Sequence, residues 1–149
     1  MKTVYLAGQI TTNNPASLEW REEAEAALRG QAHVVSPLRG KESLRAESPD
    51  GGITSSRTDS SSKAVILRDF HDVESADVIL ADLTQYDPTR PLVGTYMELA
   101  WAWYLKKPVV VIAAEDDYLA RKHPFIVESV AAYFPTLDEA VACLRRYWL

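Results

Sequence analysis

The stretch Val93–Ile112, VGTYMELAWAWYLKKPVVVI, decides the fold because it predicts a loop, a helix and a buried strand in direct succession. Thr95 and Glu98 have the three-residue spacing of a capping box, so we expect the helix to start at Thr95. Pro108 follows the expected helix end. Residues 109–112 then form a continuous apolar run, which is typical of a parallel strand buried on both faces.

Glu98 has two interpretations, which are compatible with each other. In the first, it is a capping carboxylate with no chemical role. In the second, it is a nucleophile or an acid–base group near the carboxyl ends of the strands, where open α/β sheets bind their ligands. Gly94, just before it, allows either a tight backbone turn or the close approach of another group.

The rest of the chain alternates strands and helices around this stretch. We expect strands at 3–7, 32–35, 77–83, 109–112 and 130–134, and further helices at 16–29, 64–76 and 137–147. This alternation predicts a single α/β domain over residues 1–149, with a flavodoxin-like or Rossmann-like, doubly wound, five-stranded parallel sheet of order 2-1-3-4-5. The switch point of that order brings residues 5–10 beside residues 82–95.

Residues 38–63 interrupt the pattern with a connection that is uncommonly long for a compact domain. The turn-rich Pro49–Gly52 and the serine-rich 55–62 fit a partly disordered insert, because their composition is polar. They fit equally a flap over a site, which loops of this length often form.

Composition excludes several classes of protein. A net charge of −5 over 149 residues argues against a nucleic-acid polymer as partner. Cys143 is the only cysteine, so an internal disulfide and a thiolate metal cluster are both excluded. No apolar run approaches membrane-spanning length, and residues 1–3 lead directly into a strand rather than a signal peptide. We therefore expect a soluble, cytoplasmic protein with no membrane partner.

Asp69 is the second carboxylate of interest. Val65, Asp69 and Val73 lie one helical turn apart, which places Asp69 on the inward face of the 64–76 helix. An inward carboxylate is costly unless it is paired or functional, and both explanations remain open. If the helices of Asp69 and Glu98 converge at one end of the sheet, they supply the carboxylate pair that breaks a bond to an anomeric carbon.

Other motifs are absent. Gly94 lacks the companion glycines of a dinucleotide or phosphate-binding loop. The three histidines have no metal-ligand spacing, and there is no Gly-x-Ser-x-Gly elbow.

Four segments in the right order give a resemblance that spans nearly the whole chain. They are VYLAG at 4–8, Asp69 eight residues before Asp77, ADVILAD at 76–82, and GTYMELA at 94–100 with KPV at 107–109 behind it. Together they resemble the nucleoside 2-deoxyribosyltransferase family. Three departures are Gln9 where the family often has proline, Ala100 where glycine is common, and a longer approach to Gly94 over 88–93.

The resemblance implies a transfer of 2-deoxyribose between nucleobases by retaining double displacement. Glu98 would attack C1′ of a 2′-deoxyribonucleoside to give a glycosyl–Glu98 intermediate, which a second base intercepts. Asp69 would protonate the departing base and deprotonate the incoming one. Tyr5 would orient Glu98 through a hydrogen bond, unless it is simply an aromatic core residue. No metal and no organic cofactor are implied.

The implied substrate-binding residues surround this trio. Gly8, Gln9 and Ile10 would border the base, Gly94 and Thr95 would lie beside the substrate, and Asp87, or less favourably Asp82, would hold the sugar or the base. Asp82 has the alternative role of a turn former at its strand end. His123 of a neighbouring subunit would meet the 5′-hydroxyl; its alternative role is that of a surface-loop histidine.

The expected partners are 2′-deoxyribonucleosides, free nucleobases and further copies of the chain. Trp101 and Trp103 lie on a helix that is hydrophobic all round, which favours a dimer-based homo-oligomer, up to a tetramer or hexamer, with shared active sites. One alternative function is a 2′-deoxynucleoside 5′-monophosphate N-glycosidase that grips phosphate with Arg57 and the serines around it. Another is a non-catalytic nucleotide-sensing module.

Overall fold

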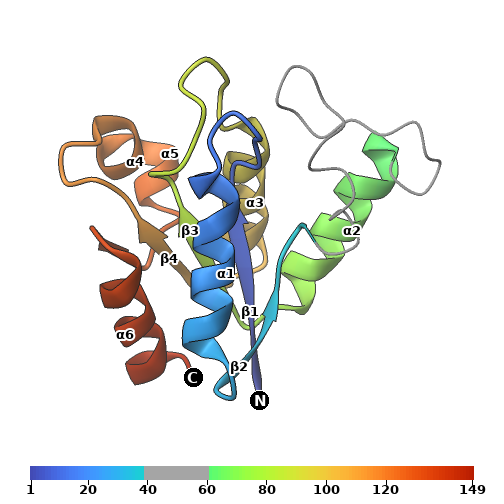
Figure 1. The fold of residues 1–149 in the computed structure, drawn as a ribbon, viewed down its shortest axis with the longest axis vertical. Coiled ribbons are helices and arrows are strands. Elements are labelled where there is room, and N and C mark those ends of the chain that lie inside the picture. The colour runs from blue at the N-terminus through green and yellow to red at the C-terminus, as the bar shows by residue number, and fades with distance from the viewer. Residues whose placement is uncertain (39–60) are drawn as a thin grey trace.

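The computed structural model describes residues 1–38 and 61–149 and contains one five-stranded sheet (Figure 1). The strands are β1 (Lys2–Gly8), β2 (Ala32–Val35), β3 (Val78–Asp82), β4 (Val109–Ile112) and β5 (Ala132–Phe134). They pair in the order β2-β1-β3-β4-β5, and every pair is parallel. This confirms the predicted α/β class and strand order. The predicted flap over 38–63 lies almost entirely outside the described residues.

Six helices are described along the chain. They are α1 (Ala16–Leu28), α2 (Ser62–Ser75), α3 (Val93–Tyr104), α4 (Tyr118–Lys122), α5 (Pro124–Val127) and α6 (Leu137–Tyr147). Helices α1 and α6 pack on one face of the sheet, and α2 and α3 pack on the other (Figure 1). None of the helices in the described ranges is long and apolar enough to cross a membrane.

Side-chain alternation along β1 assigns its residues to the two layers. Val4 and Leu6 join the core under α1 and α6, whereas Tyr5 and Ala7 join the core under α2 and α3. Both sets are fully buried, as expected of a central strand in a parallel sheet. Tyr5 is thereby directed toward α3.

The structure corrects the expected start of α3. The helix begins at Val93, two residues before Thr95, and no side chain caps it. The N–H of Tyr96 already donates to the carbonyl of Leu92, so the first turn closes earlier than the capping box predicts. The capping-box interpretation of Glu98 is therefore wrong.

Two short helices lie between β4 and β5, where the sequence pattern predicted none. The Asp117 side chain accepts a hydrogen bond from the N–H of Ala120 and caps α4. Pro124 occupies the first turn of α5, where its missing N–H carries no cost. These local signals are present in the sequence, but helices this short show no clear apolar period.

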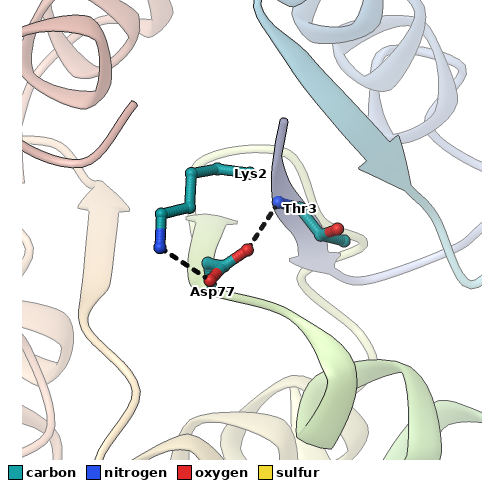
Figure 2. Close-up of polar contacts among 3 residues, drawn as sticks. All are labelled: Lys2, Thr3 and Asp77. Atoms are coloured by element: carbon teal, nitrogen blue, oxygen red, sulfur yellow. Dashed lines mark hydrogen bonds and ion pairs between the residues drawn. The ribbon is translucent and has the colours of Figure 1, made fainter.

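Asp77 ties β1 to the start of β3 at the amino-terminal edge of the sheet (Figure 2). Its carboxylate accepts hydrogen bonds from the N–H of Thr3 at 2.8 Å and from Nζ of Lys2 at 3.0 Å. Both hydrogen bonds lower the pKa of Asp77, and the bond from Thr3 has the larger effect. The resulting stabilisation is present above the ordinary carboxyl pKa and is lost as the pH falls through the lowered value.

The loops after β1 and β3 lie side by side at the opposite, carboxyl-terminal edge. Asn13 Nδ2 donates to Asp87 at 3.0 Å, Asn14 Nδ2 donates to the Tyr86 carbonyl at 3.3 Å, and the Asp87 N–H donates to Gln9 Oε1 at 2.6 Å. Both chain termini lie at the other end of the sheet from these loops (Figure 1).

Candidate active site

Strand β1 and helix α3 bring Tyr5 and Glu98 together. The Tyr5 hydroxyl donates a hydrogen bond of 2.7 Å to Oε1 of Glu98. Glu98 lies on the second turn of α3 and is only 7% exposed, and Tyr5 is fully buried. A bond to a charged acceptor in this setting is strong and restricts the orientation of the carboxylate.

The pKa of Tyr5 is raised well above its ordinary value of 10.0, first by burial and next by the charge of Glu98. The phenol is therefore protonated at neutral pH and acts as a hydrogen-bond donor.

Asp69 and Glu98 line the same cavity, which has a volume of about 450 Å³. The half-buried Asp69 enters it from α2, and Glu98 enters it from α3. The expected inward placement of Asp69 and the convergence of the two carboxylates therefore both agree with the structure. A pair of carboxyl groups in one cavity has the parts needed for attack and proton transfer at an anomeric carbon.

Five predicted substrate-binding residues also line this cavity: Gly8, Gln9, Ile10, Gly94 and Thr95. Gly94 lies in the first turn of α3, without a positive φ, so the tight-turn explanation for it does not hold. A Cβ built at Gly94 would meet no atom within 4 Å and would project into open space. The described residues thus give no steric reason for glycine here, and the close approach of another group stays a prediction.

Gly8 has a steric reason to be glycine. A Cβ there would lie 3.0 Å from the carbonyl oxygen of Asp82 and 3.2 Å from the Trp20 ring. The end of β1 consequently has no room for a side chain between its neighbours.

Asp82 and Asp87 do not line the cavity; Asp82 bonds within the loop after β3, and Asp87 bonds both within that loop and to the loop after β1. Oδ1 of Asp82 accepts from the N–H and the hydroxyl of Thr84, which is the turn-forming alternative predicted for it. Burial raises the pKa of Asp82. Asp87 accepts from Asn13 and from the N–H and hydroxyl of Thr89, and these bonds, Asn13 first, lower its pKa to about 2. A substrate contact for either carboxylate stays a prediction.

His123 lies exposed at the junction of α4 and α5 and is not among the residues that line the cavity of this chain. Its ring packs near the Phe125 ring, with centroids 6.1 Å apart. A role for it in a neighbouring subunit's site stays a prediction.

Sequence reasoning missed two arginines near the cavity. Arg90 lines it from the loop before α3, and its Nη1 is buried without a hydrogen-bond partner among the described residues. Arg21 on α1 is buried under the end of β1, and burial lowers its pKa to about 10 although attraction by Glu98 opposes that change. The sequence contains one signal for them: each arginine lies near a loop that follows a predicted strand.

Within residues 1–38 and 61–149, no group of three or more His, Cys, Asp or Glu side chains could hold a metal ion.

Comparison with known proteins identifies the family. The family model described as nucleoside 2-deoxyribosyltransferase matches residues 4–134. The chain belongs to this family. Membership confirms the resemblance seen in the sequence and implies deoxynucleoside and nucleobase substrates for an enzyme of the nucleoside deoxyribosyltransferase family. No curated protein sequence matches the chain significantly.

Solved structures share the fold of this nucleoside 2-deoxyribosyltransferase family member. A 2-deoxyribosyltransferase from Bacillus psychrosaccharolyticus is 25% identical, with a TM-score of 0.63 over 97% of this chain and 91% of that chain. A 2-desoxiribosyltransferase from Leishmania mexicana is 16% identical, with a TM-score of 0.70 over 100% of both chains. A CMP N-glycosidase from Clostridium botulinum is 21% identical, with a TM-score of 0.54 over 98% of this chain and 100% of that chain.

Proposed function

We propose that the chain transfers 2-deoxyribose between nucleobases, with Glu98 as the nucleophile. The observation that carries this proposal is the buried hydrogen bond of Tyr5 to Glu98 in a cavity that Asp69 also lines. Family membership supports the same reaction class.

The first half-reaction forms a bond from the Glu98 carboxylate to C1′ and breaks the bond from C1′ to the base nitrogen. Asp69 gives its proton to that nitrogen as the base leaves. In the second half-reaction, a nitrogen of the incoming base attacks C1′, its proton passes to Asp69, and Glu98 leaves as a carboxylate. Two displacements at one carbon retain the configuration.

Tyr5 orients the nucleophile during both steps. Because its hydroxyl bonds Oε1, the other carboxylate oxygen of Glu98 is the one we assign to attack. Gly8, Gln9 and Ile10 would border the base, and Gly94 and Thr95 would lie next to the sugar.

Product analysis tests the function. Thymidine incubated with adenine should give thymine and 2′-deoxyadenosine, whereas a hydrolase would give thymine and free deoxyribose.

Glu98→Gln keeps an acceptor for Tyr5, so it should keep the fold while lowering turnover by at least ~10³-fold. Near-normal exchange in that variant would remove the nucleophile assignment.

Asp69→Asn should slow base departure and change the pH–rate profile, and an unchanged profile would contradict the role of Asp69 in proton transfer.

A second candidate function is hydrolysis of a 2′-deoxynucleoside 5′-monophosphate. The specific observation in its favour is Arg90, which lines the cavity with a buried Nη1 that has no acceptor within the described part of the chain. A phosphate oxygen is a suitable acceptor for a guanidinium. The Clostridium botulinum CMP N-glycosidase has the same fold.

Arg90→Met separates the two candidates. If the substrate carries a phosphate, the variant should raise the KM for thymidine monophosphate by at least ~10-fold and leave thymidine nearly unaffected, because only the phosphate needs the guanidinium. Kinetics with both donors, with and without adenine, make the comparison. Equal effects on both donors would remove Arg90 as a phosphate ligand.

A further inference from the structure

Arg21 carries a buried charge whose direct partners are neutral. Its side chain is 3% exposed. Nη2 donates to the Gly8 carbonyl at 2.7 Å, and Nη1 donates to the carbonyls of Ser17 and, at 3.5 Å, Gln9. Two of these carbonyls belong to residues that line the cavity. The guanidinium thus lies directly beneath the end of β1.

Carbonyl groups alone offset such a charge poorly. A guanidinium removed from water is unfavourable unless opposite charge lies close by, and here Nε makes no hydrogen bond to any described residue. The guanidinium carbon lies 4.9 Å from the centroid of the Trp20 ring, which is a weaker compensation. Attraction by Glu98, and more weakly by Asp82, favours the charged form of Arg21.

We propose that Arg21 is a positioning residue that keeps Glu98 ionised through its fixed positive charge beneath the end of β1. Its N–H groups also hold the Gly8–Gln9 backbone in place by hydrogen bonds. The catalytic consequence rests on the proposed function. Forming the glycosyl ester removes the charge of Glu98, and releasing the ester restores it. A fixed positive charge therefore favours the second half-reaction, in which the carboxylate leaves.

Several other groups influence the same carboxylate. Helix α2 packs on α3, and β4 contributes only apolar residues beneath it. Among the described residues, Tyr5 on β1 bonds Glu98, and Asp69 and Arg90 line the same cavity. The other titratable or charged groups on the neighbouring elements are Arg68 and Asp72 on α2 and Asp82 at the end of β3. Once Asp69 has given up its proton, its carboxylate in the same cavity repels a second negative charge on Glu98, and the Arg21 cation counters that repulsion.

The test separates the charge of Arg21 from its hydrogen bonds. Arg21→Gln keeps a donor for the Gly8 carbonyl without the charge, and Arg21→Lys keeps the charge. Arg121→Met is a matched control, because Arg121 donates to the carbonyls of Ala113 and Ala114 at the end of β4, both at 2.7 Å, and packs on the Tyr133 ring. Circular dichroism checks each fold, and Arg21→Met replaces Arg21→Gln if that variant does not fold.

The readout is the titration of the Glu98 carboxyl, followed by nuclear magnetic resonance with glutamate carbon-13 labelled at the side-chain carboxyl. Its signal is assigned by its loss in Glu98→Gln. Arg21→Gln should move the titration midpoint to higher pH by ~0.5–1 unit, because a carboxylate that loses a nearby cation is protonated more easily. Arg21→Lys and Arg121→Met should leave the midpoint at the wild-type value.

A wild-type midpoint in Arg21→Gln, or an equal shift in Arg21→Lys, would overturn the proposal. The titration needs no turnover, so its outcome does not depend on whether the chain catalyses base exchange. If the wild-type protein does not exchange bases, the proposed function is contradicted, whereas the titration result still stands.

Discussion

The hydroxyl of Tyr5 is the clearest single-residue contribution to the site. Because its pKa lies well above 10.0, Tyr5 donates to Glu98 at any pH near neutrality. Tyr5→Phe should keep the fold and lower kcat by about 10- to 100-fold, since a hydrogen bond to a charged group contributes about 1.5–3 kcal/mol. Steady-state kinetics at saturating donor measure this, and a kcat within about twofold of wild type would show that Glu98 is oriented by other groups.

At this scale the sequence identified the residues with a pattern and missed those without one. Glu98 lies four residues after Gly94 in an otherwise apolar helical stretch, and Asp69 interrupts an apolar helical stripe, so both stand out. Arg21 and Arg90 do not, because an arginine on a helix or in a loop is usually solvated. Only the three-dimensional path of β1 and its following loop shows that Arg21 is buried.

At the scale of elements, the two loops beyond β1 and β3 act as one unit. Asn13 bonds Asp87, and this bond is the first cause of the low pKa of Asp87, about 2. A carboxyl with a lowered folded-state pKa stabilises the fold above its ordinary pKa and loses that effect as the pH falls toward 2. The junction of the loops is therefore strongest at neutral pH.

Asn13→Ala should lower the Tm at about pH 7, and the difference from wild type should shrink as the pH falls toward 2, because Asp87 then becomes protonated in the wild type as well. Thermal denaturation followed by circular dichroism at several pH values measures it. Thr12→Ala, an exposed neighbour, serves as the control. A Tm difference that is independent of pH would mean that the bond to Asp87 is not its cause.

The elements also show what periodicity can predict. The expected bounds of β2, β4 and α6 match those observed, because each has a regular apolar pattern and clear flanking signals. The start of α3 was misplaced because its first turn depends on the Leu92 carbonyl, a backbone feature that no side-chain pattern reports. Strand order followed from topology rules and was confirmed.

On the scale of the whole molecule, one face remains apolar. Trp103 is 61% exposed and Phe125 is 84% exposed. They flank a largely apolar cavity of about 760 Å³ between α3 and α5. Exposed patches of this kind mark interaction surfaces, and the expected homo-oligomer would cover this one with a second copy of the chain.

Phe125→Asp should therefore convert the oligomer to monomers and, if active sites are shared, lower exchange activity as well. Light scattering at micromolar concentration measures the first effect and base exchange measures the second. Tyr147→Asp is the matched control, since Tyr147 is 65% exposed on α6 across the sheet. A wild-type monomer would remove the shared site and the role of His123 with it.

The positions of the two termini have a practical consequence. Both ends of the chain lie at the edge of the sheet where Asp77 joins Lys2 and Thr3, opposite the edge that carries the loops after β1 and β3 (Figures 1 and 2). An affinity tag or a resin linkage at either end would leave the cavity mouth unobstructed. Protein immobilised in this way would present the cavity that Asp69 and Glu98 line to the flowing solution.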